Sequence, residues 1–111
     1  MSVDAAVTEL LESIVPGEAP LVESLVRMHV DTQAQSGLDD RTYLLVRLAA
    51  LIATDASAAS YLVNLTVADE IGITADDVRG VLIALGPLVG SARVLSGAER
   101  VLSAMATARQ L

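Results

Sequence analysis

The residues of this chain with the clearest chemical capacity gather between positions 47 and 64. Four polar residues interrupt an apolar stretch there, at positions i, i+3, i+4 and i+7 of a predicted helix: Ser57, Ser60, Tyr61 and Asn64. This spacing puts them on one helix face. Arg47 is the only charged residue in the apolar run that precedes them. Hydroxyls and an amide beside one cation are typical of a small pocket that binds an anion.

Arg47 has two interpretations, because a charge inside an apolar helix is costly unless it is paired. In the first, Arg47 clamps a small carboxylate ligand such as a lactone acid or a keto acid, helped by the amides at the start of the next helix. In the second, it forms a structural ion pair with Asp55. Both predict that its side chain is largely buried, is paired with a carboxylate and faces the polar residues 57–64.

The other polar residues leave similar alternatives. Ser57 and Ser60 have no base near them in sequence that would make either a nucleophile, and each could bond its own helix backbone. Asn64 either orients a carbonyl group of a ligand or satisfies a neighbouring backbone group. Tyr61 is expected to pack its ring and to leave its hydroxyl at the mouth of the pocket.

Two further residues stand apart from this group. Arg93 either caps a helix end or reaches the pocket from a neighbouring subunit. His29 is expected to be an exposed or interface residue. It is the only histidine and the chain has no cysteine, which excludes disulfides, thiol chemistry and a multi-histidine metal site within one subunit. We expect neither a metal nor a cofactor.

The spacing of apolar residues predicts helices along the whole chain and no strands. We expect one all-α domain with about six helices: 2–14, 18–35, 41–53, 55–71, 74–87 and 88–108. Thr54 or Asp55 would cap the fourth helix, and Pro87 would end or kink the fifth. Segments 41–53 and 79–86 are apolar nearly all round, so we place them at the centre of the domain.

Composition bears on partners and location. The chain is 53% hydrophobic with a mean hydropathy of +0.58, which suggests that apolar surface is covered in a homo-oligomer. No apolar run is long enough for a membrane span, and the N-terminus lacks the basic start of a signal peptide. We therefore expect a cytoplasmic protein with no membrane contact. A net charge of −7 argues against nucleic acid as a partner.

Residues 38–98 resemble the carboxymuconolactone decarboxylase and alkylhydroperoxidase D superfamily. The shared pattern has a Leu-Asp start, an Arg-Thr pair opening an apolar helix, a Gly-Ile-Thr turn at 72–74 and a Gly-x-x-Arg segment ending at Arg93. The resemblance implies an all-α, alkylhydroperoxidase D-like bundle that assembles as a homotrimer or a trimer-based hexamer.

In the peroxidase branch of that superfamily, one helix carries Cys-x-x-Cys-x-x-x-His and the preceding helix a glutamate. The resemblance puts Ser57 and Ser60 at the cysteine positions, Asn64 at the histidine position and Leu44 at the glutamate position. A serine cannot cycle through a disulfide, so we expect no thiol peroxidase activity. The resemblance implies a lyase or proton-transfer reaction on a small carboxylic acid or lactone. The alternative is a non-catalytic homo-oligomer that binds a metabolite or a protein.

Overall fold

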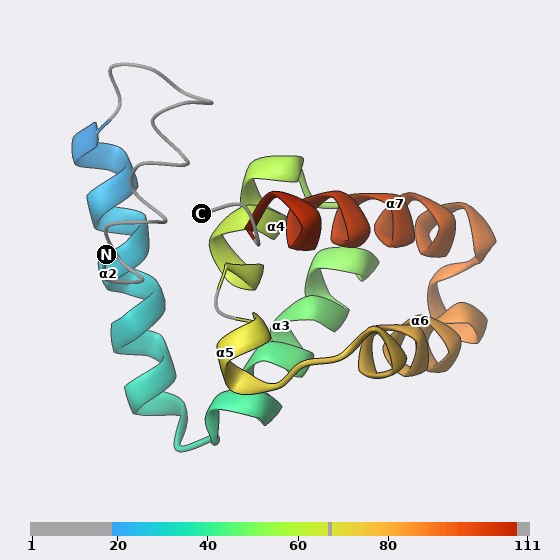
Figure 1. Cartoon of the computed structure of the whole chain (residues 1–111), viewed down its shortest axis with the longest axis horizontal. Helices are drawn as coiled ribbons and strands as arrows, with labels where there is room; N and C mark the ends of the chain where they lie inside the picture. The colour runs from blue at the N-terminus through green and yellow to red at the C-terminus, as the bar shows by residue number, and fades with distance from the viewer. Residues whose placement is uncertain (1–18, 67, 109–111) are drawn as a thin grey trace.

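The computed structural model describes residues 19–66 and 68–108, and every regular element within them is a helix (Figure 1). This confirms the all-α prediction for the described part, while the helix predicted over 2–14 lies outside it. None of the described helices combines the length and the apolar character that crossing a membrane would need. The helices are α2 (Ala19–Ser36), α3 (Asp40–Ala53), α4 (Ala58–Leu65), the single turn α5 (Ala68–Ile71), α6 (Ala75–Val89) and α7 (Ser91–Ala108).

Helix α3 is the central element, because it contacts each of the other described helices. Asp39 starts it as an N-cap, with its carboxylate accepting a hydrogen bond from the Thr42 amide at 2.7 Å. One face of α3 is fully buried, whereas Val46 on another face is 54% exposed. The helix is therefore central, as predicted, but not buried all round. Its buried residues are Tyr43, Leu44, Leu48 and Ile52.

The predicted helix over 55–71 is wrong, because the chain turns before it and breaks within it. Thr54 is the C-cap of α3 and not an N-cap, since its amide donates to the Ala50 carbonyl at 3.0 Å. Asp55 has a positive φ of 53°, which reverses the chain direction. Ser57 is extended and caps α4 by accepting from the Ser60 amide. Helix α4 then ends at Leu65.

Helix α6 begins as predicted and ends later than predicted. Thr74 and Asp77 form a capping box in which each side chain accepts a hydrogen bond from the other residue's amide. The helix continues past Pro87 to Val89. Proline lacks one N–H donor, and so close to the end this removes only one hydrogen bond of the helix. Gly90 ends the helix with a φ of 89°, a conformation that favours glycine.

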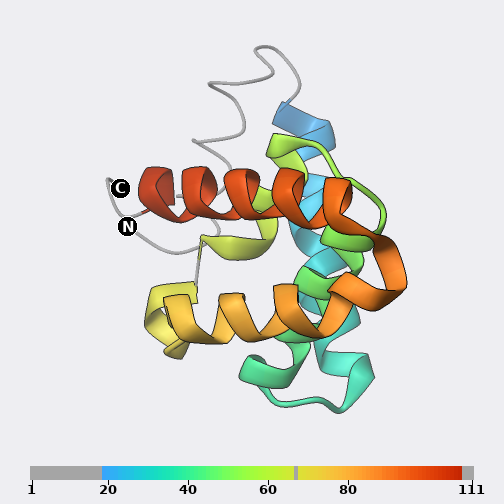
Figure 2. The same cartoon turned by 90° about the vertical axis from the view of Figure 1, so that its right-hand side faces the viewer.

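The segment 79–86 is not buried on all sides, in contrast to the prediction. Only Val78 of α6 is buried, while Ile83 is 69% and Leu88 is 81% exposed. Helices α6 and α7 lie side by side (Figure 2), and α7 adds two exposed leucines, Leu95 and Leu102. We call Ile83, Leu88, Leu95 and Leu102 the exposed α6–α7 residues.

A glycine lets α7 approach α3 and α4 closely. A Cβ at Gly97 would lie 3.0 Å from Ile52 Cγ1 and 3.3 Å from the Tyr61 hydroxyl. Both neighbours are fully buried, so neither can move aside easily. Tyr61 thus packs inside the core, and its hydroxyl has no hydrogen-bond partner among the described residues. Burial raises the pKa of this phenol.

We expect Gly97→Ala to lower the free energy of unfolding by up to about 2 kcal/mol. Overpacking a core costs about 1–3 kcal/mol, against a gain in helix propensity of about 1 kcal/mol. Gly80→Ala is the matched control, because a Cβ there meets nothing within 4 Å. It should stabilise the protein by about 0.5–1 kcal/mol. Urea unfolding at one protein concentration measures both, and equal shifts for the two variants would contradict this packing.

An ion pair joins the start of α3 to the start of α6. Arg41 donates to the Asp77 carboxylate and, at 3.3 Å, to the Gly72 carbonyl. The bonds from Arg41 and from the Thr74 amide lower the pKa of Asp77 from its usual 3.8 to about 2. A carboxylate with a lowered pKa stabilises the fold above its ordinary pKa and loses that effect as the pH falls through its folded value.

We expect Asp77→Asn to be less stable than the wild type at pH 6. The difference between their free energies of unfolding should narrow as the pH falls from about 4 to 2. The comparison is the urea midpoint of both proteins at each pH. Asp76→Asn is the control, because Asp76 is 87% exposed and, in the described part of the chain, pairs with Arg79 of its own helix, at 3.3 Å. It should shift the midpoint little at any pH. A gap for Asp77→Asn that stays constant down to pH 2 would contradict the role of the ion pair.

Candidate functional site

A hollow of about 310 Å³ lies between α2, α3 and α4. Three of the residues predicted to form a pocket line it: Arg47, Ser60 and Asn64. The structure thus brings together the cation and half of the predicted polar group. The complete lining comprises Met28, Thr32, Arg47, Leu51, Ser60, Val63 and Asn64.

Arg47 is half-buried and is held by two neutral acceptors. Its Nε donates to Asn64 Oδ1, and its Nη1 donates to the Tyr43 hydroxyl at 2.8 Å. Its guanidinium carbon lies 5.1 Å from the centre of the Tyr43 ring, within the range of a cation–π interaction. These bonds use two of the five N–H groups of the guanidinium. The side chain faces Asn64 and Ser60, as predicted.

Asn64 sets the direction of the guanidinium. It is 5% exposed, and its Nδ2 donates to the Ser60 carbonyl at 2.7 Å while its Oδ1 accepts from Arg47. Both ends of the amide are therefore bonded, which fixes its orientation. Asn64 thus has the second of its two predicted roles, satisfying a backbone group, and also positions Arg47.

The predicted ion pair between Arg47 and Asp55 is wrong. Asp55 pairs instead with Arg100 of α7, at 3.1 Å, and accepts from the Ser96 hydroxyl at 2.9 Å. Asp55 lies in a left-handed turn after α3, and its carboxylate bonds two residues of α7. Among the described side chains, no carboxylate pairs with Arg47. The other expectation for Arg47, a carboxylate partner, is therefore also wrong within this part of the chain.

The remaining predicted residues lie outside the hollow. Ser57 is the N-cap of α4, with its oxygen 3.2 Å from the Ser60 hydroxyl. Tyr61 and Leu44 belong to the buried core, so Tyr61 does not place its hydroxyl at a pocket mouth. Arg93 donates to the Ala53 carbonyl at the end of α3, which matches its predicted capping role. His29 lies on α2, and its side chain is not among those described.

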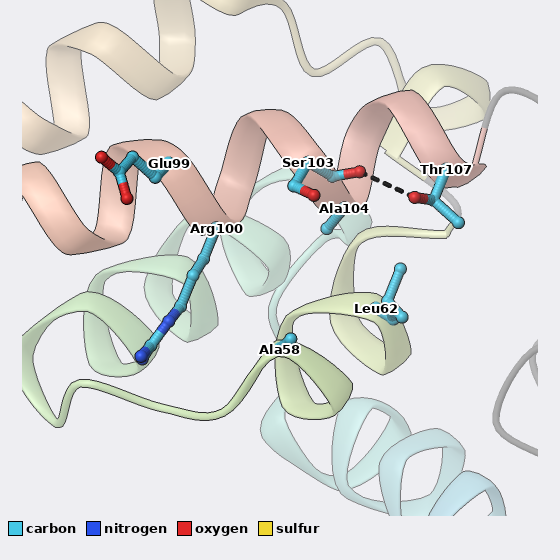
Figure 3. A pocket seen from close by; sticks show the side chains of 7 residues that line it. All are labelled: Ala58, Leu62, Glu99, Arg100, Ser103, Ala104 and Thr107. Carbon is cyan, nitrogen blue, oxygen red and sulfur yellow. Dashed lines mark hydrogen bonds between the residues drawn. The ribbon is translucent and has the colours of Figure 1, made fainter. Parts of the chain in front are cut away.

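A second hollow, of about 250 Å³, lies between α4 and α7 (Figure 3). Its cation, Arg100, extends toward the connection between α3 and α4, where it bonds Asp55 and the Ala56 carbonyl. Thr107 donates to the Ser103 carbonyl within α7. The cation of this hollow is thus paired with a carboxylate, and its other charged residue, Glu99, is an acid, which makes it the weaker candidate for an anion site.

Sequence reasoning missed several residues of the first hollow. Met28 and Thr32 come from α2, and the sequence carries no signal that this helix packs beside residues 47–64. Leu51 and Val63 read as ordinary core residues. Tyr43 could have been found, because it precedes Arg47 by four positions and therefore shares its helix face.

No three His, Asp or Glu side chains in the described part of the chain cluster as a metal site would require. Comparisons with protein-family models, with curated proteins and with solved structures found no match. Any function is therefore inferred from the geometry of the hollow. The hollow has one oriented cation, Arg47, one amide bonded at both ends, Asn64, and otherwise mainly apolar walls.

Proposed function

We propose that this chain binds a small carboxylate in the hollow between α2, α3 and α4, with Arg47 as the group that recognises it. The observation that carries the proposal is a half-buried guanidinium that lines an open hollow and has no carboxylate partner among the described residues. A cation partly removed from water gains most from an anion that supplies both charge and acceptor oxygens.

The other arginines support the choice of Arg47. Of the six in the described part of the chain, four pair with a carboxylate: Arg27, Arg41, Arg79 and Arg100. Arg93 is exposed and donates to a backbone carbonyl. Arg47 alone among them combines partial burial with neutral partners. In a chain with a net charge of −7, a cation that has no acidic partner among the described residues supports the choice of an external anion.

We also propose that this chain belongs to the carboxymuconolactone decarboxylase and alkylhydroperoxidase D superfamily. The support for this membership is the sequence pattern over residues 38–98. Ser57 and Ser60 replace the thiols of the peroxidase branch, so the protein works without thiol redox chemistry. We propose that the space of the former redox site is used to hold a ligand.

A lyase or proton-transfer reaction on the bound acid is the second candidate. The observation that favours it is the Tyr43 hydroxyl, which lies 2.8 Å from Arg47 Nη1. Tyr43 is 4% exposed and is not part of the lining, so this candidate requires the bound acid to reach past Arg47 in order to exchange a proton with the phenol. Loss of carbon dioxide from a bound lactone acid, abolished in Tyr43→Phe with binding retained, would establish the reaction.

Calorimetry with sodium butyrate and with uncharged butyramide tests the proposed binding. We expect butyrate to bind and butyramide not to bind, because Arg47 recognises the charge. Arg47→Met should weaken butyrate binding by about tenfold or more, the value of a charged hydrogen bond. Asn64→Asp should have the same effect, because a carboxylate at this position would pair with Arg47 and neutralise it.

Arg79→Met is the matched control, since it removes an equal charge from a side chain that is 73% exposed and outside the hollow. It should bind butyrate as the wild type does. Thermal melts without ligand show whether each variant is folded. Equal butyrate affinity in the folded Arg47→Met variant would contradict the proposal.

We also propose that the chain forms a homo-oligomer, a trimer or a trimer-based hexamer, through the exposed α6–α7 residues. The support is the exposure of four large aliphatic side chains on two adjacent helices, between 63% and 81% of each. Leu95 and Leu102 are seven positions apart and so share one side of α7, and exposed apolar side chains that gather in this way mark an interaction surface.

Sedimentation equilibrium at micromolar concentration should give a species of at least three subunits. Leu95→Glu combined with Leu102→Glu should give a monomer, because both side chains would bring charge into the interface. Val30→Glu on α2, a residue that is 48% exposed, is the control and should leave the assembly intact. A wild-type species near 11.5 kDa would contradict the oligomer.

A further inference from the structure

We propose that Met28 is a site of reversible oxidation by hydroperoxides, and that its sulfoxide weakens carboxylate binding by bonding Arg47. This inference rests on the proposed carboxylate binding at Arg47 and adds a means of regulating it. Three observations support it: the exposure of Met28, its position beside Arg47, and the N–H groups of Arg47 that no described residue accepts.

Met28 is the methionine that an oxidant in solution reaches in the described part of the chain. Its side chain is 62% exposed, whereas Met105 is 6% exposed and belongs to the core. A thioether sulfur takes up one oxygen atom to become a sulfoxide, and exposure to solvent decides how readily a given methionine reacts. A hydroperoxide should therefore modify Met28 well before Met105.

Met28 lies on α2 at the level of Arg47 on α3. Helix α2 enters the short connection at residues 37–39 and α3 leaves it (Figure 1), so position along the two helices can be counted from Leu38. Met28 precedes Leu38 by ten residues, and Arg47 follows it by nine. Both residues line the same hollow, and both have long side chains with several rotatable bonds. The end of the Met28 side chain can therefore reach the guanidinium.

Arg47 can bond a further acceptor. Asn64 Oδ1 accepts from its Nε and the Tyr43 hydroxyl accepts from its Nη1, which leaves three of the five N–H groups without a partner among the described residues. A thioether sulfur is a weak acceptor, so reduced Met28 competes little for these groups. A sulfoxide is polar, and its oxygen accepts hydrogen bonds. It would occupy the same N–H groups that the proposed carboxylate needs.

The oxidation is a two-electron step that needs a hydroperoxide as its only co-reactant. A lone pair of the Met28 sulfur attacks the outer oxygen of the peroxide, so that an S–O bond forms and the O–O bond breaks. The proton of the transferred oxygen passes to the departing oxygen, which leaves as water or as an alcohol. The sulfur is oxidised and the peroxide is reduced. Methionine sulfoxide reductases reverse the change.

Calorimetry with sodium butyrate before and after treatment with hydrogen peroxide tests the inference. Peptide mass spectrometry should show one added oxygen atom at Met28 before Met105 is modified. We expect the protein with oxidised Met28 to bind butyrate about fivefold more weakly than the untreated protein, the value of one hydrogen bond that the carboxylate must displace. Treatment with the two methionine sulfoxide reductases, one for each epimer, should restore the affinity.

Two variants assign the effect to Met28. Met28→Leu removes the sulfur with little change in volume, so its butyrate affinity should be the same before and after peroxide treatment. Met28→Gln places an amide oxygen near the position of the sulfoxide oxygen. Without peroxide it should bind butyrate about fivefold more weakly than Met28→Leu. Val30→Gln is the matched control, because Val30 is exposed on the same helix and lies outside the hollow. It should bind butyrate as the wild type does.

The outcomes separate this inference from the function it rests on. If the untreated protein binds butyrate and the protein with oxidised Met28 binds it equally well, the site binds carboxylates as proposed and the inference about Met28 is wrong. An equal loss of affinity in peroxide-treated Met28→Leu would place the effect at another residue and would also overturn the inference. If the untreated protein does not bind butyrate, the proposed function fails and this inference fails with it.

Discussion

Arg47 lies where α2, α3 and α4 meet, and partial burial there removes much of the water that would otherwise solvate its charge. The protein supplies two neutral acceptors, the Asn64 amide oxygen and the Tyr43 hydroxyl, and among the described side chains it supplies no carboxylate. Neutral acceptors orient a guanidinium without cancelling its charge. The guanidinium is therefore oriented and keeps its charge. Orienting it requires an acceptor that is itself fixed, which explains why Asn64 is buried and bonded at both ends of its amide.

The rest of the fold holds α3 in place so that Arg47 faces α4. Asp39 caps the start of the helix, and Arg41 ties that start to Asp77 on α6. At the other end, Arg93 of α7 donates to the Ala53 carbonyl. Beyond it, Arg100 bonds the Asp55 carboxylate and the Ala56 carbonyl of the connection to α4. These polar contacts satisfy the helix end and the connection, while the aliphatic core between α3, α4 and α7 supplies the main burial.

The sequence predicted the helical class, the position of α3 and the direction of Arg47, because these depend on apolar spacing and on residues close together in the chain. It did not predict the turn at Asp55, since a non-glycine residue with a positive φ has no clear sequence signal. At that turn, Asp55 forms an ion pair with Arg100, a residue 45 positions away. Contacts over such separations, including the approach of Met28 and Thr32 to the hollow, depend on tertiary packing and not on local pattern.

The exposed face of α6 shows a related limit. Residues 79–86 are apolar nearly all round, which correctly indicates that they favour burial, but spacing alone does not say whether the covering surface comes from the same chain. In the described chain Val81, Leu82 and Leu85 pack against the core, whereas Ile83 is 69% exposed. The apolar pattern therefore correctly indicated that part of the segment packs against the core. It was wrong in predicting that the same chain buries the segment on every side.

The central claim is that Arg47, held by Asn64, is the group that contacts a bound carboxylate. Nuclear magnetic resonance of nitrogen-15-labelled protein tests it directly, because Asn64 is the only asparagine of the chain and its side-chain amide signals can be assigned from Asn64→Asp. On titration with sodium butyrate, we expect the Asn64 amide and the Arg47 Nε–H signals to shift together and to give one dissociation constant. Butyrate-induced shifts confined to Arg93 or Arg100, with the Arg47 and Asn64 signals unmoved, would contradict the claim.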